Sequence, residues 1–235
     1  MARTEHHLAV KLAKALLLTL LLSSLGASFA QEIARVRAGH LIADGSSLEV
    51  WVNGAPSHEL TAFKEITDWS ELPSGAALLE LRDPSDPSVV RASLEASFRT
   101  GFRYLVAALG TEQDMQLAVY TDHPALADGT AGFRVINAIP DSDTLRIHSA
   151  ESCGDAIFIL GPFRFMGSNV RYDTHEYSWT GPGAVCDDTG LLLELPKLDV
   201  TVNDGYAIRG KAVTLYLVGS IASGTVEAFK TIDAE

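Results

Sequence analysis

Leu48-Glu49-Val50-Trp51-Val52, followed by Asn53-Gly54, is the stretch that decides the fold class of this chain of 235 residues. Apolar residues alternate here with polar or amphipathic ones, which is the period of a strand with one buried face. Asn-Gly directly after such a run is a strong signal for a tight turn. Arg35-Val36-Arg37-Ala38 alternates in the same way. We therefore expect β structure in this part of the chain.

Similar strand patterns recur along the rest of the sequence, at Ala77–Leu81, Tyr104–Leu109, Met115–Tyr120, Val213–Val218 and Val226–Phe229. Turn-forming residues separate them, as in Pro73-Ser74-Gly75 and Thr100-Gly101. Short strands, frequent turns and no sustained helical period predict an all-β fold of antiparallel β-sandwiches. Residues 63–72 are the stretch for which a helical turn is an alternative.

The sequence also repeats itself. The matching blocks are Val36-Arg37-Ala38 with Phe133-Arg134-Val135 and Asp44–Val50 with Asp141–Ile147 at an offset of 97, Leu78–Leu81 with Leu192–Leu195 at 114, and Gly101–Gly110 with Gly210–Gly219 at 109. The blocks keep their order, as duplication predicts. We expect two tandem sandwiches, at residues 31–124 and 130–235, with 17 extra residues in the middle of the second.

Residues 1–30 have the pattern of an export signal. Basic residues precede an uncharged run from 15 to 30, which ends with Ser28 and Ala30 at the positions that signal peptidase reads. The run is shorter than the roughly 20 residues of a membrane-spanning helix, so an uncleaved anchor is the weaker alternative. We expect a signal peptide cleaved before Gln31, a mature chain without a transmembrane segment, and a periplasmic or extracellular location.

The charge balance bears on the partners. The chain has 18 basic and 30 acidic residues and a formal net charge of −12. An acidic protein repels phosphate backbones, so nucleic acid is not an expected partner. The charge is interpreted as a contribution to solubility.

The two cysteines, Cys153 and Cys186, both lie in the part expected to be exported. In an oxidising compartment they predict one disulfide, which contributes about 3–4 kcal/mol on the chain-entropy estimate. A metal or redox pair is disfavoured because the spacing is far from Cys-x-x-Cys. We expect the disulfide to pin the extra loop of the second repeat.

Ala34–His40 and Leu48–Gly54 together resemble the opening of the bacterial family "domain of unknown function 4397" (DUF4397). That family shows an Arg-Val-Arg strand ending in His, then a loop, then a Val-Asp-Val-Tyr-Val-Asn-Gly strand. Leu72–Gly75 and Gly101–Gly110 fit its pattern as well. The resemblance covers nearly all of 33–121 and, more loosely, 130–230. It implies tandem immunoglobulin-like or transthyretin-like sandwiches outside a bacterial cell, and it implies no activity.

Some positions depart from the family pattern. Glu49 stands where the family has Asp, Asn137 stands where it has His, and Arg146 takes the acidic position in the second repeat. The His and the acid are therefore not a functional pair shared by both repeats.

Reaction motifs are missing from the sequence. It contains no Gly-x-Ser-x-Gly, no His-Glu-x-x-His and no phosphate-binding glycine-rich loop, and no cofactor is expected. The histidines outside the signal stand alone: His40, His58, His123, His148 and His175. For His40 we expect a hydrogen-bonded strand-end side chain rather than a catalytic one.

Two short acidic clusters are weak candidates for calcium. Asp141 and Asp143 form one of them, and Asp187-Asp188 beside Cys186 forms the other. The favoured interpretation is that these residues cap turns through their own backbone.

Aromatic and polar residues gather between the two cysteines. Tyr172, His175, Tyr177 and Trp179 are our candidate binding residues there, with Glu176 among them. The alternative is that Tyr177 and Trp179 cover the sandwich core. Trp51 is a further candidate, since strand alternation points it away from the core, either to solvent or between the two domains.

Together these patterns favour a non-catalytic envelope or extracellular module that binds a polymer or a protein. Two alternatives stay open. One is an exported hydrolase that uses carboxylates distant in sequence, because a fold does not decide function. The other is a structural spacer of the envelope that binds no free ligand.

Overall fold

The computed structural model describes residues 32–122, 130–148, 152–164, 166, 170–173, 182–195 and 211–234, and every regular element in them is a strand. The sixteen strands are β1 (Ile33–His40), β2 (Leu48–Val52), β3 (Ala55–Leu60), β4 (Ser70–Pro73), β5 (Gly75–Asp83), β6 (Asp86–Phe98), β7 (Arg103–Gly110), β8 (Met115–Asp122), β9 (Thr130–Asn137), β10 (Leu145–His148), β11 (Ala156–Leu160), β12 (Val170–Asp173), β13 (Gly183–Cys186), β14 (Leu191–Leu195), β15 (Lys211–Val218) and β16 (Glu227–Ala234). The all-β prediction is confirmed. The alternative of a helical turn at 63–72 is wrong, because this stretch holds a turn, a bridge at Ile66 and β4. Within the described part of the chain, no helix is long and apolar enough to cross a membrane.

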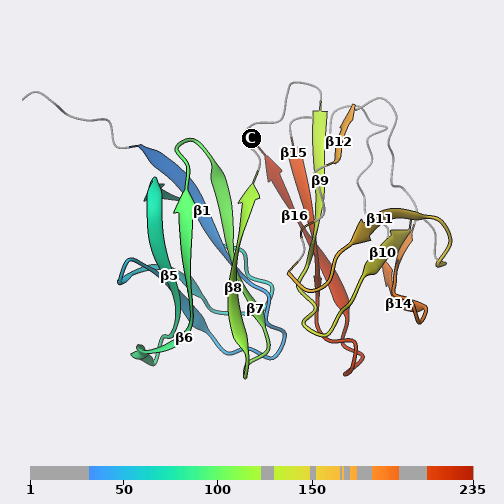
Figure 1. Cartoon of the computed structure of the whole chain (residues 1–235), viewed down its shortest axis with the longest axis horizontal. Helices are drawn as coiled ribbons and strands as arrows, with labels where there is room; N and C mark the ends of the chain where they lie inside the picture. Colours follow the sequence, from blue (N-terminus) through green and yellow to red (C-terminus); the bar gives the residue numbers. More distant parts are fainter. Residues whose placement is uncertain are drawn as a thin grey trace, which may run out of the picture. The chain divides into compact units, whose positions relative to one another are not determined.

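The first half consists of two four-stranded sheets, ordered β4-β1-β7-β8 and β3-β2-β5-β6 (Figure 1). Alternate side chains of both sheets meet in one core, so that Leu48, Val50 and Val52 of β2 are buried as their spacing predicts. All strand pairs are antiparallel except β1–β7, which is parallel. That pair departs from the expected antiparallel pattern because the chain passes through the other sheet between β1 and β7, as a parallel pair requires.

The second half has the same strand order in its two sheets, β12-β9-β15-β16 and β11-β10-β13-β14. Its β9–β15 pair is parallel, as β1–β7 is in the first half. A second apolar core lies between these sheets and includes Val135, Ile147 and Leu215.

The strand register corrects one block of the expected repeat. Leu192–Leu195 lies in β14, which pairs with β13 as β6 pairs with β5. The segment therefore takes the place of β6, whereas Leu78–Leu81 lies in β5. The match at an offset of 114 was wrong because a leucine-rich tetrapeptide suits any half-buried strand.

The extra residues of the second half were expected between the two cysteines. The stretch from Cys153 to Cys186 contains β11, β12 and β13, which take the places of β3, β4 and β5. Residues 149–151, 165, 167–169 and 174–181 lie outside the described residues, so the extra loop stays a prediction.

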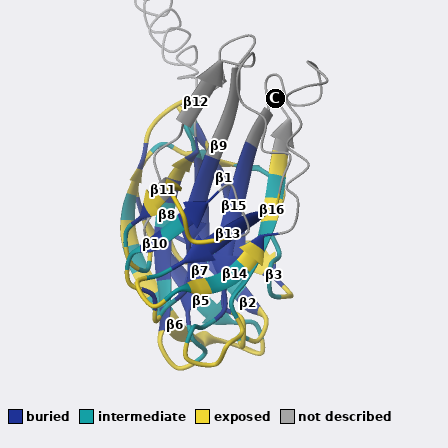
Figure 2. Cartoon of the chain, turned by 90° about the vertical axis from the view of Figure 1, so that its right-hand side faces the viewer, coloured by how far each residue is buried: buried dark blue, intermediate teal, exposed yellow. Residues whose placement is uncertain are grey.

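A third apolar core joins the two halves. It contains residues of β7 and β8 from one half and of β9 and β15 from the other, among them Leu105, Tyr120, Ile136 and Tyr216. Figure 2 shows the buried strands β7 and β15 in dark blue. The outer faces of these two sheets therefore pack against each other in a buried apolar core.

Polar contacts across this junction follow an approximate two-fold relation. Lys64 and Arg164 both have a φ of 70° and occupy matching places after β3 and β11. Lys64 Nζ lies 2.5 Å from Glu227 Oε2 in β16, and Arg164 Nη1 donates to Gln116 Oε1 in β8 at 3.0 Å. Each half therefore holds the other with an equivalent residue, as in a symmetric dimer interface.

A buried ion cluster lies at the same junction. Arg37 of β1 and Arg134 of β9 both bind the carboxylate of Asp122, at 3.2 Å and 2.9 Å. Arg134 also donates to Thr214 Oγ1 at 2.6 Å, and the Arg37 guanidinium lies 4.5 Å from the ring centre of Trp69. The three charged side chains are at most 7% exposed, so this cluster fixes the position of β9 against β8.

Candidate functional site

The polar residues at the ends of β1 and β9 hold turns. His40 Nε2 lies 2.8 Å from the Ser46 carbonyl oxygen, and the His40 side chain is fully buried. Asn137, in the matching place, donates to Ser142 Oγ at 2.8 Å and to the Gly161 carbonyl at 3.1 Å. Each side chain thus stabilises, through a hydrogen bond, the turn that follows its own strand. The interpretation of His40 as a hydrogen-bonded strand-end residue is confirmed.

Asp141 anchors the loop between β15 and β16. Its carboxylate accepts hydrogen bonds from Ser220 Oγ (2.8 Å), the Ile221 N–H (3.0 Å) and the Ala222 N–H (2.8 Å). Partial burial acts to raise the pKa of Asp141, but these hydrogen bonds outweigh it and hold the pKa below its ordinary value. Asp141 therefore anchors this loop through its backbone N–H groups, while Asp143 is exposed.

Asp44 and Glu112 make the corresponding link in the first half. Asp44 Oδ1 accepts a long hydrogen bond of 3.3 Å from the Glu112 N–H, between β7 and β8. The Glu112 carboxylate accepts from the Ser46 N–H at 3.0 Å and contacts Arg91 at 3.1 Å. The loop after β1 is thereby joined to the loop after β7.

A glycine starts each of these two anchored loops. Gly110 has a φ of 100° and Gly219 a φ of 96°. A Cβ at Gly110 would lie 2.1 Å from the Asp114 carbonyl oxygen, and one at Gly219 would lie 2.2 Å from the Thr225 carbonyl oxygen. Both the backbone conformation and the close approach require glycine.

The anchored loops enclose a cleft of about 520 Å³ between the two halves. Its lining residues are Ala43, Asp44, Phe63, Gly110 and Thr111 from the first half, and Pro140, Gly219, Ser220, Ser223, Thr225 and Glu227 from the second. Several of them stand in matching places, so the cleft lies across the approximate two-fold relation of the halves. We refer to it as the junction cleft.

The junction cleft offers hydroxyl groups, an aromatic ring and two carboxylates. Glu227 is held by Lys64 at 2.5 Å, and Asp44 accepts from a backbone N–H. The arrangement therefore provides a hydrogen-bonding surface with an apolar side. Within the described residues, no group of three or more His, Cys, Asp or Glu side chains is placed to hold a metal ion.

Trp51 lies elsewhere, on the outer face of the β3-β2-β5-β6 sheet. It is half-buried beneath the guanidinium of Arg82, which lies 4.5 Å from its ring centre. Its Nε1 donates to Glu49 Oε2 at 2.8 Å. All these contacts are within the first half, so Trp51 is neither freely exposed nor packed between the halves. Trp51 is covered because Arg82 of β5 lies directly opposite Glu49 of β2, and its guanidinium extends over the neighbouring Trp51 ring.

The other expected binding residues are not brought into a described site. The backbone of Tyr172 lies in β12, directly opposite Ala131 of β9 in the antiparallel pair. His175, Tyr177 and Trp179 lie outside the described residues.

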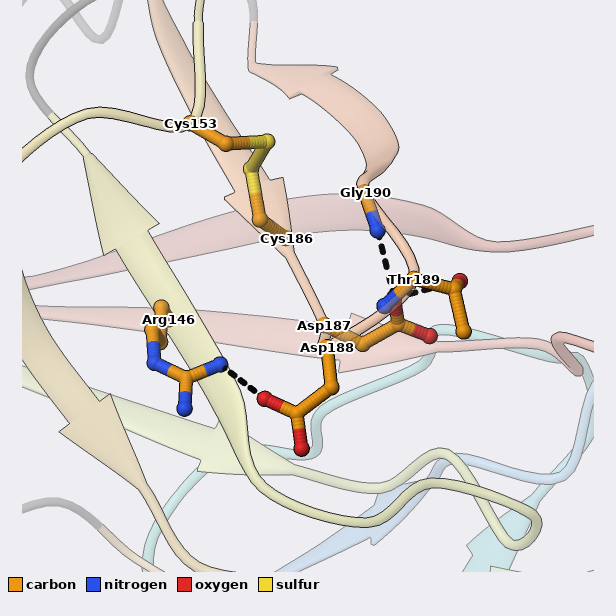
Figure 3. The surroundings of a disulfide bond; sticks show 7 residues. All are labelled: Arg146, Cys153, Cys186, Asp187, Asp188, Thr189 and Gly190. Carbon is orange, nitrogen blue, oxygen red and sulfur yellow. Dashed lines mark hydrogen bonds and ion pairs between the residues drawn. A yellow bond between two sulfur atoms is a disulfide. The ribbon is translucent and has the colours of Figure 1, made fainter.

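The predicted disulfide joins Cys153 to Cys186, with 6.0 Å between their Cα atoms (Figure 3). It links the connection between β10 and β11 to the end of β13. The prediction of this pairing is confirmed.

The second acidic cluster follows the disulfide directly. Asp187 Oδ1 accepts from the Thr189 N–H at 2.6 Å and the Gly190 N–H at 3.0 Å, and Asp188 pairs with Arg146 at 2.6 Å (Figure 3). Partial burial acts to raise the pKa of Asp187, but these hydrogen bonds outweigh it and lower the pKa. The cluster caps a turn, as the favoured interpretation held.

Sequence reasoning missed the junction cleft. The lining residues Ser223, Thr225 and Glu227 belong to no sequence motif. They lie across the cleft from the first half only because the two halves pack together. One signal was present in the sequence: Phe63-Lys64 recurs as Phe163-Arg164, and this pair marks the segment that crosses the junction.

A family model matches part of this chain. Residues 34–148 match "Domain of unknown function (DUF4397)", from β1 to the end of β10. This supports the resemblance seen at Ala34–His40 and Leu48–Gly54, and it assigns no activity. A search of the curated proteins found no match.

Two solved structures are distantly similar. One is a putative cell adhesion protein from Parabacteroides distasonis, with 11% identity and a TM-score of 0.26, covering 86% of this chain and 99% of that one. The other is the tip fimbrial protein Mfa3 from Porphyromonas gingivalis with a C-terminal truncation, with 10% identity, a TM-score of 0.25 and the same two coverages. Similarity at these TM-scores supports no conclusion about this chain.

Proposed function

We propose that the chain is an exported, non-catalytic module that binds a polymer or a protein of the cell envelope or the extracellular space. The junction cleft is the observation that carries the proposal. Its walls come from both halves, it mixes hydroxyl groups with the Phe63 ring, and its volume of about 520 Å³ lies in the range of ligand sites.

Anchored loops make the cleft suited to binding. Asp141 holds the β15–β16 loop, and Asp44 with Glu112 holds the β7–β8 loop. A site that keeps its shape without ligand loses less conformational entropy when it binds. The packed core between the halves fixes the two walls relative to each other.

The two halves are proposed to be tandem copies of one domain, at residues 31–124 and 130–235. The same strand order, the same parallel pair and the two glycines Gly110 and Gly219 support this. Export is supported by the signal-like residues 1–30 and by the Cys153–Cys186 disulfide, since disulfides persist in oxidising compartments.

Co-sedimentation tests the proposed function. The purified, oxidised chain is mixed with intact cell envelopes and with insoluble polysaccharides, and the bound fraction is measured against concentration. Saturable binding to one preparation is the expected result. Absence of binding to every preparation would contradict the proposal and turn attention to Asp44 and Glu227 as part of an enzyme.

The aromatic cluster between the cysteines is proposed as a second contact surface. Replacing Tyr177 and Trp179 with Ala should reduce envelope binding and leave the melting temperature unchanged, because a contact surface adds little to the core. The melting curve of the double variant is the control. A fall of several degrees would show instead that these rings cover the core.

A further inference from the structure

Two arginines of the first half stand side by side with like charges. Arg35 of β1 is directly opposite Arg103 of β7 in the parallel pair. Both side chains point away from the core of the first half, since their neighbours Val36 and Tyr104 point into it. Like charges directly opposite each other destabilise a sheet, so this pair costs stability unless something compensates it.

The neighbouring acids do not neutralise the two arginines. Asp122 is the next partner across the sheet from Arg103, but its carboxylate is bound by Arg37 and Arg134. Glu71, an exposed residue of β4, is the partner of Arg35 on the other side. Within the described part of the chain, no ion pair is formed by Arg35 or Arg103 with these acids.

The second half shows that the fold does not need these charges. The matching pair across β9 and β15 is Gly132 opposite Ala212. In contrast, Arg37 and Arg134 occupy matching places and both serve the buried ion cluster. The arginines of the ion cluster are thus present in both halves, whereas Arg35 and Arg103 have counterparts without charge in the second half.

The two arginines line a groove with an apolar side. The groove has a volume of about 340 Å³, and its other lining residues within the described part of the chain are Ile33, Gly101 and Phe102. A third cation lies next to it, since the Arg99 guanidinium is 5.9 Å from the Phe102 ring centre. Arg103 is stacked over Trp69 at 5.7 Å, which restrains its direction.

We propose that this groove binds a carboxylate carried on an apolar group, with Arg35 and Arg103 on the carboxylate and Phe102 and Ile33 on the apolar part. Guanidinium groups bind carboxylates through paired, charge-assisted hydrogen bonds. The net charge of −12 works against long polyanions, so the ligand group carries a single charge or few charges. This site is separate from the junction cleft and does not depend on its role.

Calorimetric titration of the purified chain with phenylacetate tests the proposal, with phenylacetamide as the neutral twin. Phenylacetate should bind measurably and more weakly at higher salt, and phenylacetamide should bind at least about tenfold more weakly. Arg35→Gln and Arg103→Gln should each weaken phenylacetate binding by about tenfold or more. Arg91→Gln, which removes an arginine paired with Glu112, is the matched control and should bind as the native chain does.

The melting temperature separates this role from a structural one. Arg35→Gln relieves the repulsion from Arg103, so its melting temperature should equal or exceed that of the native chain while binding falls. A lower melting temperature of this variant would point to a structural arginine and overturn the proposal. Equal binding of phenylacetate and its amide, or native affinity in both arginine variants, would also overturn it. Tighter binding of inorganic phosphate than of phenylacetate would overturn the assignment to carboxylates.

Discussion

At the scale of single residues, acids and glycines hold the loops that surround the junction cleft. Asp141 receives two backbone N–H groups from a loop about eighty residues further along the chain. In the sequence, Asp141-Ser142-Asp143 looks the same whether it binds calcium or caps a loop. Its hydrogen-bond partners in the structure, Ile221 and Ala222, show that it caps a loop, and the local sequence around Asp141 does not reveal them.

The pH dependence of stability tests the role of Asp141. Its pKa in the folded chain lies below the ordinary value, so its stabilisation is present above pH about 4 and is lost as the pH falls through the folded pKa. Asp141→Asn should therefore lower the melting temperature at pH 7, and the difference from the native chain should shrink toward pH 3. Asp143→Asn, at an exposed neighbour, is the control. A difference that stays constant from pH 7 to pH 3 would contradict this role.

Gly219 makes a second prediction at this scale. A Cβ there would lie 2.2 Å from the Thr225 carbonyl oxygen, and the φ of 96° is strained for any other residue. Gly219→Ala should cost roughly 2 kcal/mol or more in urea unfolding. Gly154→Ala should change little, because a Cβ at Gly154 would meet nothing within 4 Å. Equal midpoints for the two variants would argue against the close approach.

At the scale of elements, the sequence predicted the strands and their buried faces. It predicted only some of the pairings between strands. The alternation in Leu48–Val52 predicted which side chains are buried, and the cysteine count predicted the disulfide. The parallel pairs and the position of β14 next to β13 were not predictable. The sequence of a strand shows which of its side chains are buried, but it does not show which strand lies beside it. The alanine positions of the outer faces, such as Ala107 and Ala118, gave no sign that they meet another sheet.

The ion cluster between β1, β8 and β9 gives the prediction for this scale. Asp122→Ala removes the carboxylate that the buried Arg37 and Arg134 share, which should cost about 3–5 kcal/mol in denaturant unfolding. Asp188→Ala breaks the exposed pair with Arg146 and should cost under about 1 kcal/mol. A loss at Asp122 as small as that at Asp188 would show that solvent reaches the cluster.

At the scale of the whole molecule, the described strands from β1 to β16 share three cores, and the third joins the halves. Lys64 and Arg164 cross the junction in matching ways, so the halves meet as two subunits of a symmetric dimer do. The repeated strand pattern indicated two sandwiches. It did not indicate that their outer faces pack on each other, and the junction cleft exists only because they do.

The most direct test of the account is to fill the junction cleft and measure envelope binding again. Ser223→Trp places a large ring among the lining residues, while Ser93→Trp places the same ring on the exposed side of β6 as the control. The account predicts that saturable co-sedimentation is lost in Ser223→Trp and kept in Ser93→Trp, with both variants melting as the native chain does. Native binding by Ser223→Trp would contradict the central claim that the junction cleft is the binding site.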